Sequence, residues 1–150
     1  MRVLGIRCHS DHVDYAVVDG ATRANAHLVE QEKLKYPAHL ARPEELAWLR
    51  REMEELARRM RPDAVGLAST PPGAQRVSVT RAESDGIVLE IFAALKCTVQ
   101  KMLNPTLRAA FGAKNNAQLD SSLGSFPAMD GVASSRSEPV AVAIALLPES

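Results

Sequence analysis

The sequence predicts an α/β fold, with a mixed five-stranded sheet, the element order βββαβαβα and helices on both faces. Three runs rich in strand-forming residues and joined by short polar breaks open the chain, a pattern typical of an antiparallel meander. Amphipathic segments then alternate with short apolar runs, which indicates parallel strands connected by helices. Because 46% of the 150 residues are apolar, we expect residues 1–150 to form one domain with a substantial core.

The first third of the chain is expected to form three strands, over residues 2–8, 12–19 and 25–33. The dipeptide Asp19-Gly20 ends the second run, and Asp-Gly is a strong signal for a tight turn. The connections are too short for crossovers, so consecutive strands are expected to pair antiparallel.

A long amphipathic helix is expected next, over residues 43–61. Pro43 suits its first position, because the N–H that proline lacks has no helical partner there. Apolar residues recur at three- and four-residue steps, the spacing that lines one face of a helix. Charged residues cover the remainder, and we interpret them as a solvated face with helical ion pairs rather than as a partner-binding face.

Two crossover units are expected to follow. Residues 64–68 form a short apolar run, typical of a buried parallel strand. After a proline-containing loop, Thr80 and Glu83 have capping-box spacing, which predicts a helix that begins after Thr80 and extends to about Leu95. Residues 97–102 are the fifth expected strand.

The C-terminal third is expected to be less regular. Thr106 is the predicted cap of a short helix that ends at Phe111. Residues 112–137 are rich in Gly, Asn and Ser, and we expect a flexible segment with a helical turn or two, long enough to suggest function or mobility. A closing helix is expected over residues 138–147, with Pro139 near its first position.

Composition excludes several classes of protein. The chain has 18 Lys and Arg against 18 Asp and Glu, so it is neither an acidic or basic disordered tail nor a protein with a wholly basic, nucleic-acid-binding surface. Its two cysteines, Cys8 and Cys97, are too few for a disulfide framework, and we expect reduced, buried thiols. The absence of an apolar run of membrane-spanning length or a signal-peptide core predicts a cytoplasmic protein with no membrane partner.

Several segments, taken with the element order, resemble one known fold family. Leu4-Gly5-Ile6, the polar turn after it and Tyr15 to Asp19 are similar to the opening hairpin of the RuvC-type Holliday-junction resolvases, a branch of the ribonuclease H-like superfamily. The actin-like ATPase half-domain shares this opening and stays an alternative. The other segments that resemble the resolvases are Ala64-Val65-Gly66-Leu67-Ala68, Arg81-Ala82-Glu83 with Gly86-Ile87-Val88-Leu89, the Asn104-Pro105 break before Arg108 and Gly112, and Ala141-Val142-Ala143-Ile144-Ala145.

The resemblance implies a two-metal nuclease, but this chain departs from the pattern. Such enzymes hold two divalent ions with carboxylates at the ends of the first and fourth strands and at the start of the last helix. These positions fall on Arg7, Ala68 and Glu138, with Ser135 one turn earlier as the other match for the third. Only Glu138 keeps an acid, and Arg7 would place a cation where Mg²⁺ should bind. A degenerate, non-catalytic domain is therefore expected.

Other residues could still supply a site. Asp11 and Asp14 lie just beyond the first strand and, with Glu138, are candidate catalytic acids of a displaced site that would use Mg²⁺ or Mn²⁺. A metal site of His9, Asp11 and His12 is conceivable, and polar residues of a β-turn are the simpler interpretation. Phosphate-binding glycine loops, Cys-x-x-Cys pairs and nucleophile elbows are absent from the sequence.

Three functions stay open. The first is a non-catalytic domain that binds nucleic acid or a protein at Arg7, Ala68, Ser69 and Glu138. Arg7 is there either a phosphate contact or a plain surface arginine. The second is a divalent-metal-dependent nuclease with a displaced carboxylate site, and the third is a structural or interaction module that forms a homodimer through its central helix. No cofactor is expected unless nuclease activity is retained.

Overall fold

The computed structural model describes residues 1–69 and 78–150, and its strands form one five-stranded sheet in the order β3-β2-β1-β4-β5. The first three strands pair antiparallel, while β4 pairs parallel with β1 and with β5. The elements are β1 (Arg2–Cys8), β2 (His12–Asp19), β3 (His27–Lys35), α1 (Arg42–Met60), β4 (Ala64–Ser69), α2 (Val79–Ala94), β5 (Thr98–Leu103), α3 (Asn104–Ala110), α4 (Asn116–Leu123), a 3₁₀ turn (Pro127–Met129), a second (Ser134–Arg136) and α5 (Ser137–Ala145).

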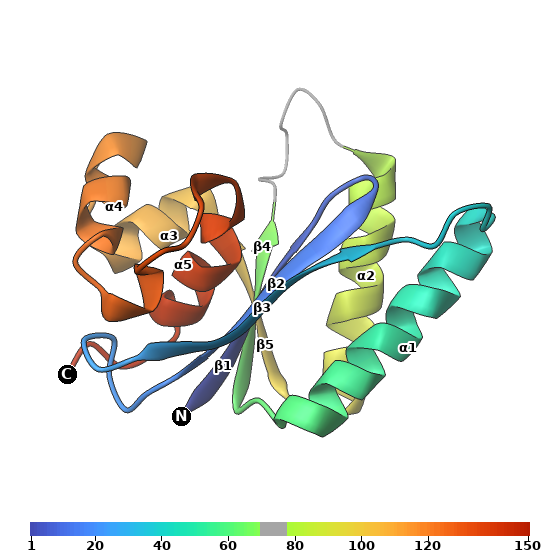
Figure 1. Ribbon diagram of the computed structural model, residues 1–150, viewed down its shortest axis with the longest axis horizontal. Coiled ribbons are helices and arrows are strands. Elements are labelled where there is room, and N and C mark those ends of the chain that lie inside the picture. Colours follow the sequence, from blue (N-terminus) through green and yellow to red (C-terminus); the bar gives the residue numbers. More distant parts are fainter. Residues whose placement is uncertain (70–77) are drawn as a thin grey trace.

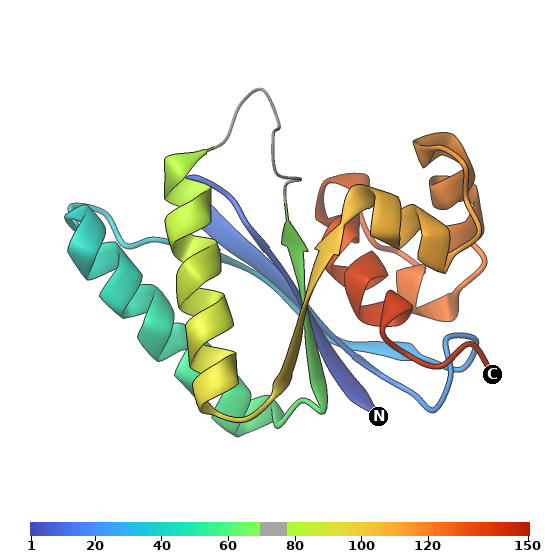
Figure 2. The same cartoon turned by 180° about the vertical axis from the view of Figure 1, so that it is seen from behind.

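Helices cover both faces of the sheet, as predicted. Figures 1 and 2 show α1 and α2 on one side of the strands, and α3, α4 and α5 on the other. The predicted α/β class, element order and strand directions are confirmed. The predicted loop over residues 69–79 lies largely outside the described residues.

The cap of α2 differs from the prediction. Ser78, not Thr80, is the N-cap residue, and its side-chain oxygen accepts a hydrogen bond from the backbone N–H of Arg81 at 3.2 Å. Like Thr80, Ser78 has a side-chain oxygen that can accept from a backbone N–H three residues later, so either residue could have been the N-cap of α2. Glu83 accepts a hydrogen bond from the side chain of Arg42 instead of closing a capping box.

The C-terminal third also departs from expectation in detail. Helix α3 starts at Asn104 with Pro105 in its first turn, so the prediction that Thr106 caps it is wrong. Within residues 112–137 the chain forms α4, whose N-cap Asn115 accepts the backbone N–H of Gln118 at 2.9 Å, and the two 3₁₀ turns. Mobility of this segment stays a prediction.

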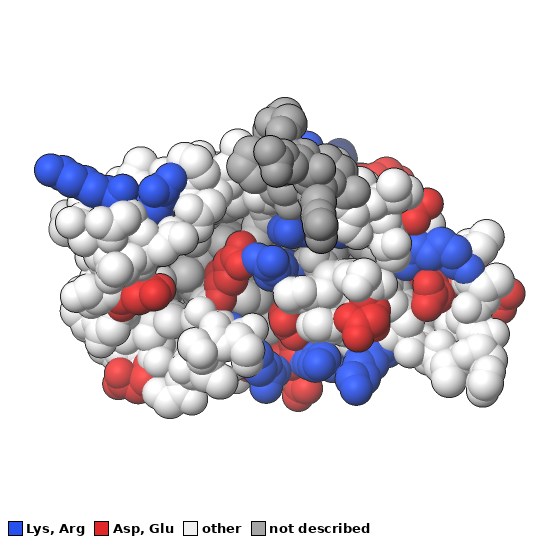
Figure 3. Space-filling model, turned by 90° about the horizontal axis from the view of Figure 1, so that it is seen from above, with Lys and Arg blue, Asp and Glu red and all other residues white. Residues whose placement is uncertain are grey.

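Charged residues of both signs lie on the face of the molecule that Figure 3 shows. Seen from above, Lys and Arg side chains lie next to Asp and Glu side chains over much of the visible face (Figure 3). In the part of the chain that the structure describes, no helix has both the length and the apolar character needed to cross a bilayer.

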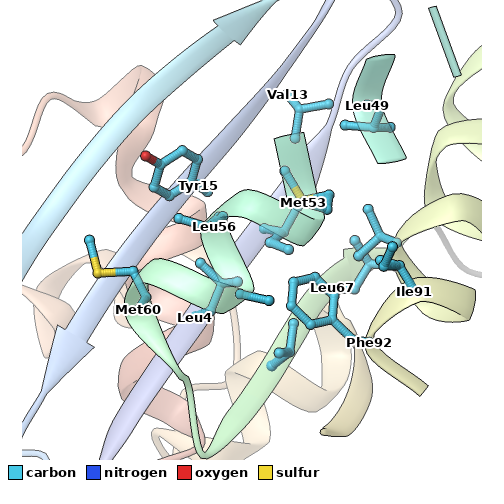
Figure 4. Packing of buried hydrophobic residues seen from close by; sticks show 14 of the residues in the cluster. Leu4, Val13, Tyr15, Leu49, Met53, Leu56, Met60, Leu67, Ile91 and Phe92 are labelled. Atoms are coloured by element: carbon cyan, nitrogen blue, oxygen red, sulfur yellow. The ribbon is translucent and has the colours of Figure 1, made fainter. Parts of the chain in front are cut away.

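The larger core lies between the sheet and the pair α1 and α2. Figure 4 shows side chains from both helices meeting those of the strands, with Phe92 from α2 between Leu4 and Leu67. Leu49 and Met53 of α1 are fully buried in the same cluster. The three- and four-residue spacing in the sequence therefore marks the face of α1 that packs on the sheet.

Two glycines let α5 approach the opposite face closely. Gly5 of β1 and Gly66 of β4 are register partners, so they lie side by side under the helix. A Cβ atom on Gly5 would overlap the carbonyl oxygen of Pro139, and one on Gly66 would overlap the Val142 side chain. The missing side chains thus set the height of α5 above the carboxyl end of the sheet.

We predict that Gly5→Ala destabilises the fold by about 3 kcal/mol, the upper end of typical costs for overpacking. Gly86→Ala is the matched control, because a Cβ on this helical glycine meets no other atom within 4 Å. Alanine in a helix is favoured over glycine by about 1 kcal/mol, so the control should gain stability. Urea unfolding measures both variants, and equal stability of Gly5→Ala and the wild type would contradict the close contact.

Candidate functional site

A row of paired residues crosses all five strands near the carboxyl end of β1. The strand register pairs, from β3 to β5, Lys33 with Asp14, Asp14 with Arg7, Arg7 with Ala68 and Ala68 with Met102. Directly paired residues project from the same face of a sheet. Ala68 and Met102 pack in the cluster under α5, so this row belongs to the α5 face.

At the centre of the row, Arg7 forms an ion pair with Glu138 in the first turn of α5. Side-chain exposures of 30% and 36% leave both groups accessible from solvent. The N-terminal end of a helix favours a carboxylate such as that of Glu138. The guanidinium of Arg7, on β1, neutralises the negative charge of this carboxylate. The one acid kept from the expected metal-binding pattern is therefore committed to an arginine.

Ala68 contributes no chemical group from its side chain, which is fully buried. Its carbonyl oxygen accepts a hydrogen bond from Nη2 of Arg81 at 2.9 Å, so a second guanidinium lies at the end of β4. Ser69, the next residue, lines a cleft of about 540 Å³ together with Arg81 and Lys101. Three cationic side chains therefore lie at this edge: Arg7 of β1, Arg81 of α2 and Lys101 of β5.

The residues present do not fit a pair of divalent ions at this edge. Two such ions need several oxygen ligands, and carboxylates supply most of them in proteins. Here the three expected positions hold Arg7, a buried alanine at 68 and a carboxylate, Glu138, already paired with that arginine.

The displaced set of Asp11, Asp14 and Glu138 does not converge in the structure. Asp11 Oδ1 lies 2.6 Å from Nδ1 of His12, and Asp14 Oδ2 lies 3.1 Å from Nε2 of His9. Glu138 forms its ion pair with Arg7 instead. Within residues 1–69 and 78–150, one group of three potential ligands converges, and it consists of His9, His12 and Asp14.

That group lies on the β1–β2 hairpin. The backbone N–H of His9 donates to the carbonyl of His12 at 2.8 Å and closes a turn around Ser10 and Asp11. The two imidazole rings stack with centroids 4.1 Å apart, and both Nε2 atoms face Oδ2 of Asp14, at 3.1 Å from His9 and 3.4 Å from His12. The structure therefore replaces Asp11 of the set conceived from the sequence with Asp14.

The electrostatics of the hairpin follow from this packing. Burial is the main cause that lowers the pKa of His9, with the electrostatic effects of His12 and Arg7 adding to it. The hydrogen bond with His12 lowers the pKa of the exposed Asp11 carboxyl. A neutral His9 next to an ionised Asp11 is thus favoured near pH 7.

Sequence reasoning missed Asp85, a half-buried residue of α2 at the same edge. Burial raises the pKa of its carboxyl, although Arg81, Lys101 and Arg7 act in the opposite direction. The Cys8 thiol, fully buried on the other face of β1, has a pKa raised by burial and by Asp85. The four-residue step from Arg81 to Asp85, which puts both on one helix face, is the signal that could have found them.

Comparison with solved structures shows which known fold this is. The "Thermus thermophilus RuvC structure" superposes with a TM-score of 0.80 at 18% identity, covering 97% of this chain and 92% of that one. "T. thermophilus RuvC in complex with Holliday junction substrate" gives 0.77 at 19% identity, covering 97% and 91%. The yeast mitochondrial Holliday junction resolvase gives 0.67 at 9% identity, covering 95% and 77%.

No family model and no curated protein matches the sequence. At these identities the likeness defines the fold alone: an α/β fold of the ribonuclease H-like type that matches RuvC, with a five-stranded mixed sheet in the order β3-β2-β1-β4-β5. The resemblance found in the sequence is therefore confirmed at the level of fold.

We predict that Asp85→Asn raises the melting temperature at pH 7. The folded-state pKa of Asp85 lies above its ordinary value of 3.8, so the protonated form favours folding and this contribution is lost as pH rises through the folded pKa. An amide stays neutral at every pH, so the gain should appear above pH 4 and vanish at pH 3. Thermal melts across this range test it, and a gain of equal size at pH 3 and pH 7 would contradict it.

Proposed function

We propose that this chain is a non-catalytic nucleic-acid-binding domain that takes structured DNA. The observation that carries the proposal is Arg7, a partly exposed cation at the strand position where metal-dependent enzymes of this fold are expected to have an acid. By the resemblance to the resolvases, a phosphodiester would bind at this edge. An arginine there can contact a phosphate by charge-assisted hydrogen bonds but cannot hold a metal ion.

Neighbouring cations support the same use of the edge. Arg81 and Lys101 line the adjoining cleft. Arg7, Arg81 and Lys101 all lie near enough to Asp85 to lower the pKa of its carboxyl by their charge. Arg7 projects from the α5 face of the sheet and Lys101, the register partner of Leu67, from the α1–α2 face, so phosphates could be contacted from both sides of this edge. The solved T. thermophilus RuvC complex with a Holliday junction substrate supports branched DNA as the first ligand to try.

The balance of charge limits how this binding can work. The chain has no net charge, and acidic side chains lie among the basic ones on the visible upper face (Figure 3). Long-range attraction to the DNA backbone is therefore weak, and affinity depends on a few local contacts. A homodimer through α2 stays a prediction, and its two copies would double the number of such contacts.

We predict that the protein binds a four-way DNA junction with a shallow salt dependence. Two or three phosphate contacts correspond to a slope of about −2 to −3 for log K against log salt concentration. Arg7→Gln should weaken binding roughly tenfold, the scale of one charge-assisted hydrogen bond. Fluorescence anisotropy from 50 to 200 mM salt, concentrations over which such slopes are resolved, measures both quantities.

Arg58→Gln is the matched control for this experiment. Arg58 is exposed on α1, and α1 covers the face of the sheet opposite to the one that carries Arg7. Its replacement should therefore leave the affinity for DNA unchanged. Melting temperatures of both variants show whether each is folded. No binding at the lowest salt concentration, or equal loss in Arg7→Gln and Arg58→Gln, would contradict the proposal and favour a protein partner.

A further inference from the structure

We propose that His9, His12 and Asp14 form a binding site for one divalent transition-metal ion of the Zn²⁺ class. The site lies on the β1–β2 hairpin and uses none of the three strand-end and helix-start positions at 7, 68 and 138. The inference does not depend on the proposed function, because it concerns a separate set of ligands.

The hairpin register is what brings the three ligands together. His9 and His12 face each other across a two-residue turn, and Asp14 follows His12 by two residues, so all three project from one side of the ribbon. Their ligand atoms all lie within 4.8 Å of one another. Pairing of backbone atoms, not chance contact between flexible side chains, therefore fixes the cluster.

The distances match those between ligands of one metal ion. Zn²⁺ binds imidazole nitrogen and carboxylate oxygen at about 2.0–2.2 Å, so two ligands in a tetrahedral site are about 3.3 Å apart. Asp14 Oδ2 lies 3.1 Å from Nε2 of His9 and 3.4 Å from Nε2 of His12. An ion can bind all three atoms once the stacked rings, whose planes are 12° apart, turn so that both Nε2 lone pairs point to one position.

A second carboxylate orients one of the histidines. Nδ1 of His12 lies 2.6 Å from Oδ1 of Asp11, and with Nδ1 as the donor of this hydrogen bond the Nε2 atom is left to bind a metal ion. The same Nε2 atom lies 3.4 Å from Oδ2 of Asp14, so a metal ion there would contact both groups. Carboxylate–histidine–metal arrangements have this form, with the outer acid fixing the tautomer.

Asp14 shows an independent sign of a missing partner. The residue is only 4% exposed, and its Oδ1 atom is buried without any hydrogen-bond partner among the described residues. A buried carboxylate oxygen left unpaired is costly and calls for an explanation such as an ion. A divalent cation against this carboxylate would supply the missing charge.

The donor set decides which metal fits. Two imidazoles and one carboxylate suit Zn²⁺, Co²⁺ or Fe²⁺, whereas Mg²⁺ and Ca²⁺ prefer oxygen ligands alone. Three protein ligands leave a fourth position for water or an anion. The ion would then bind at the hairpin, on the same sheet face as Arg7, whose guanidinium is paired with Glu138.

Zn²⁺ titration of the purified protein by calorimetry tests the site. We expect one Zn²⁺ per chain, an increase in melting temperature with Zn²⁺, and no such increase with Mg²⁺ at the same concentration. His9→Gln should weaken Zn²⁺ binding at least a hundredfold. Asp11→Asn should weaken it about tenfold, because Asp11 acts through His12.

The control and a second readout keep the test decisive. His27→Gln changes a histidine on β3 outside the cluster and should bind Zn²⁺ as the wild type does. Co²⁺ should give the visible absorption of a four-coordinate site in the wild type and lose it in His9→Gln. No Zn²⁺ binding, equal binding by His9→Gln and His27→Gln, or equal stabilisation by Mg²⁺ would overturn the proposal.

Discussion

Helix α5 crosses the sheet where two adjacent strands carry glycine, and the arrangement of the candidate site depends on this contact. Gly5 and Gly66 leave room for the backbone of α5 at Pro139 and for the side chain of Val142. The helix start therefore lies close enough for Glu138 to reach Arg7. A helix held further away by side chains would leave Arg7 unpaired at the sheet edge, since no other acid contacts its guanidinium among the described residues.

The Arg7–Glu138 pair changes what this edge can do. A divalent ion about 4 Å from a guanidinium meets repulsion on the order of 8 kcal/mol at an effective dielectric constant of 20. One carboxylate cannot offset that repulsion for two ions. A phosphate, in contrast, can compete with Glu138 for Arg7, because a guanidinium binds either anion in the same fork geometry. Under the proposed function, this edge would bind a phosphate through Arg7 where a metal-dependent enzyme would bind metal ions through acids.

Residues in regular strands were the ones that the sequence could predict. Strand ends follow from apolar runs, so the positions of Arg7 and Ala68 and their place at one edge could be predicted along with the element order. The correct N-cap of α2 could not, because Ser78 and Thr80 both have suitable side chains and only the backbone geometry decides between them.

The cluster of His9, His12 and Asp14 also depends on backbone geometry that the sequence alone does not give. The sequence indicated His9 and His12, but it suggested Asp11 as the third ligand because Asp11 lies between them. Alternation along β2 instead points Asp14 to their side, and this depends on a register that pairs Asp14 with Arg7. The contribution of Arg81 depends on the rotation of α2 over the sheet, which its weakly amphipathic sequence does not specify.

Metal-dependent cleavage of a labelled four-way DNA junction is the most direct test of the central claim, that this edge has exchanged metal-binding acids for an arginine. An edge without the metal-binding acids should leave the strands intact when the junction is incubated with excess protein and either Mg²⁺ or Mn²⁺. Strand cleavage that requires the metal ion and is abolished by Glu138→Gln would contradict it.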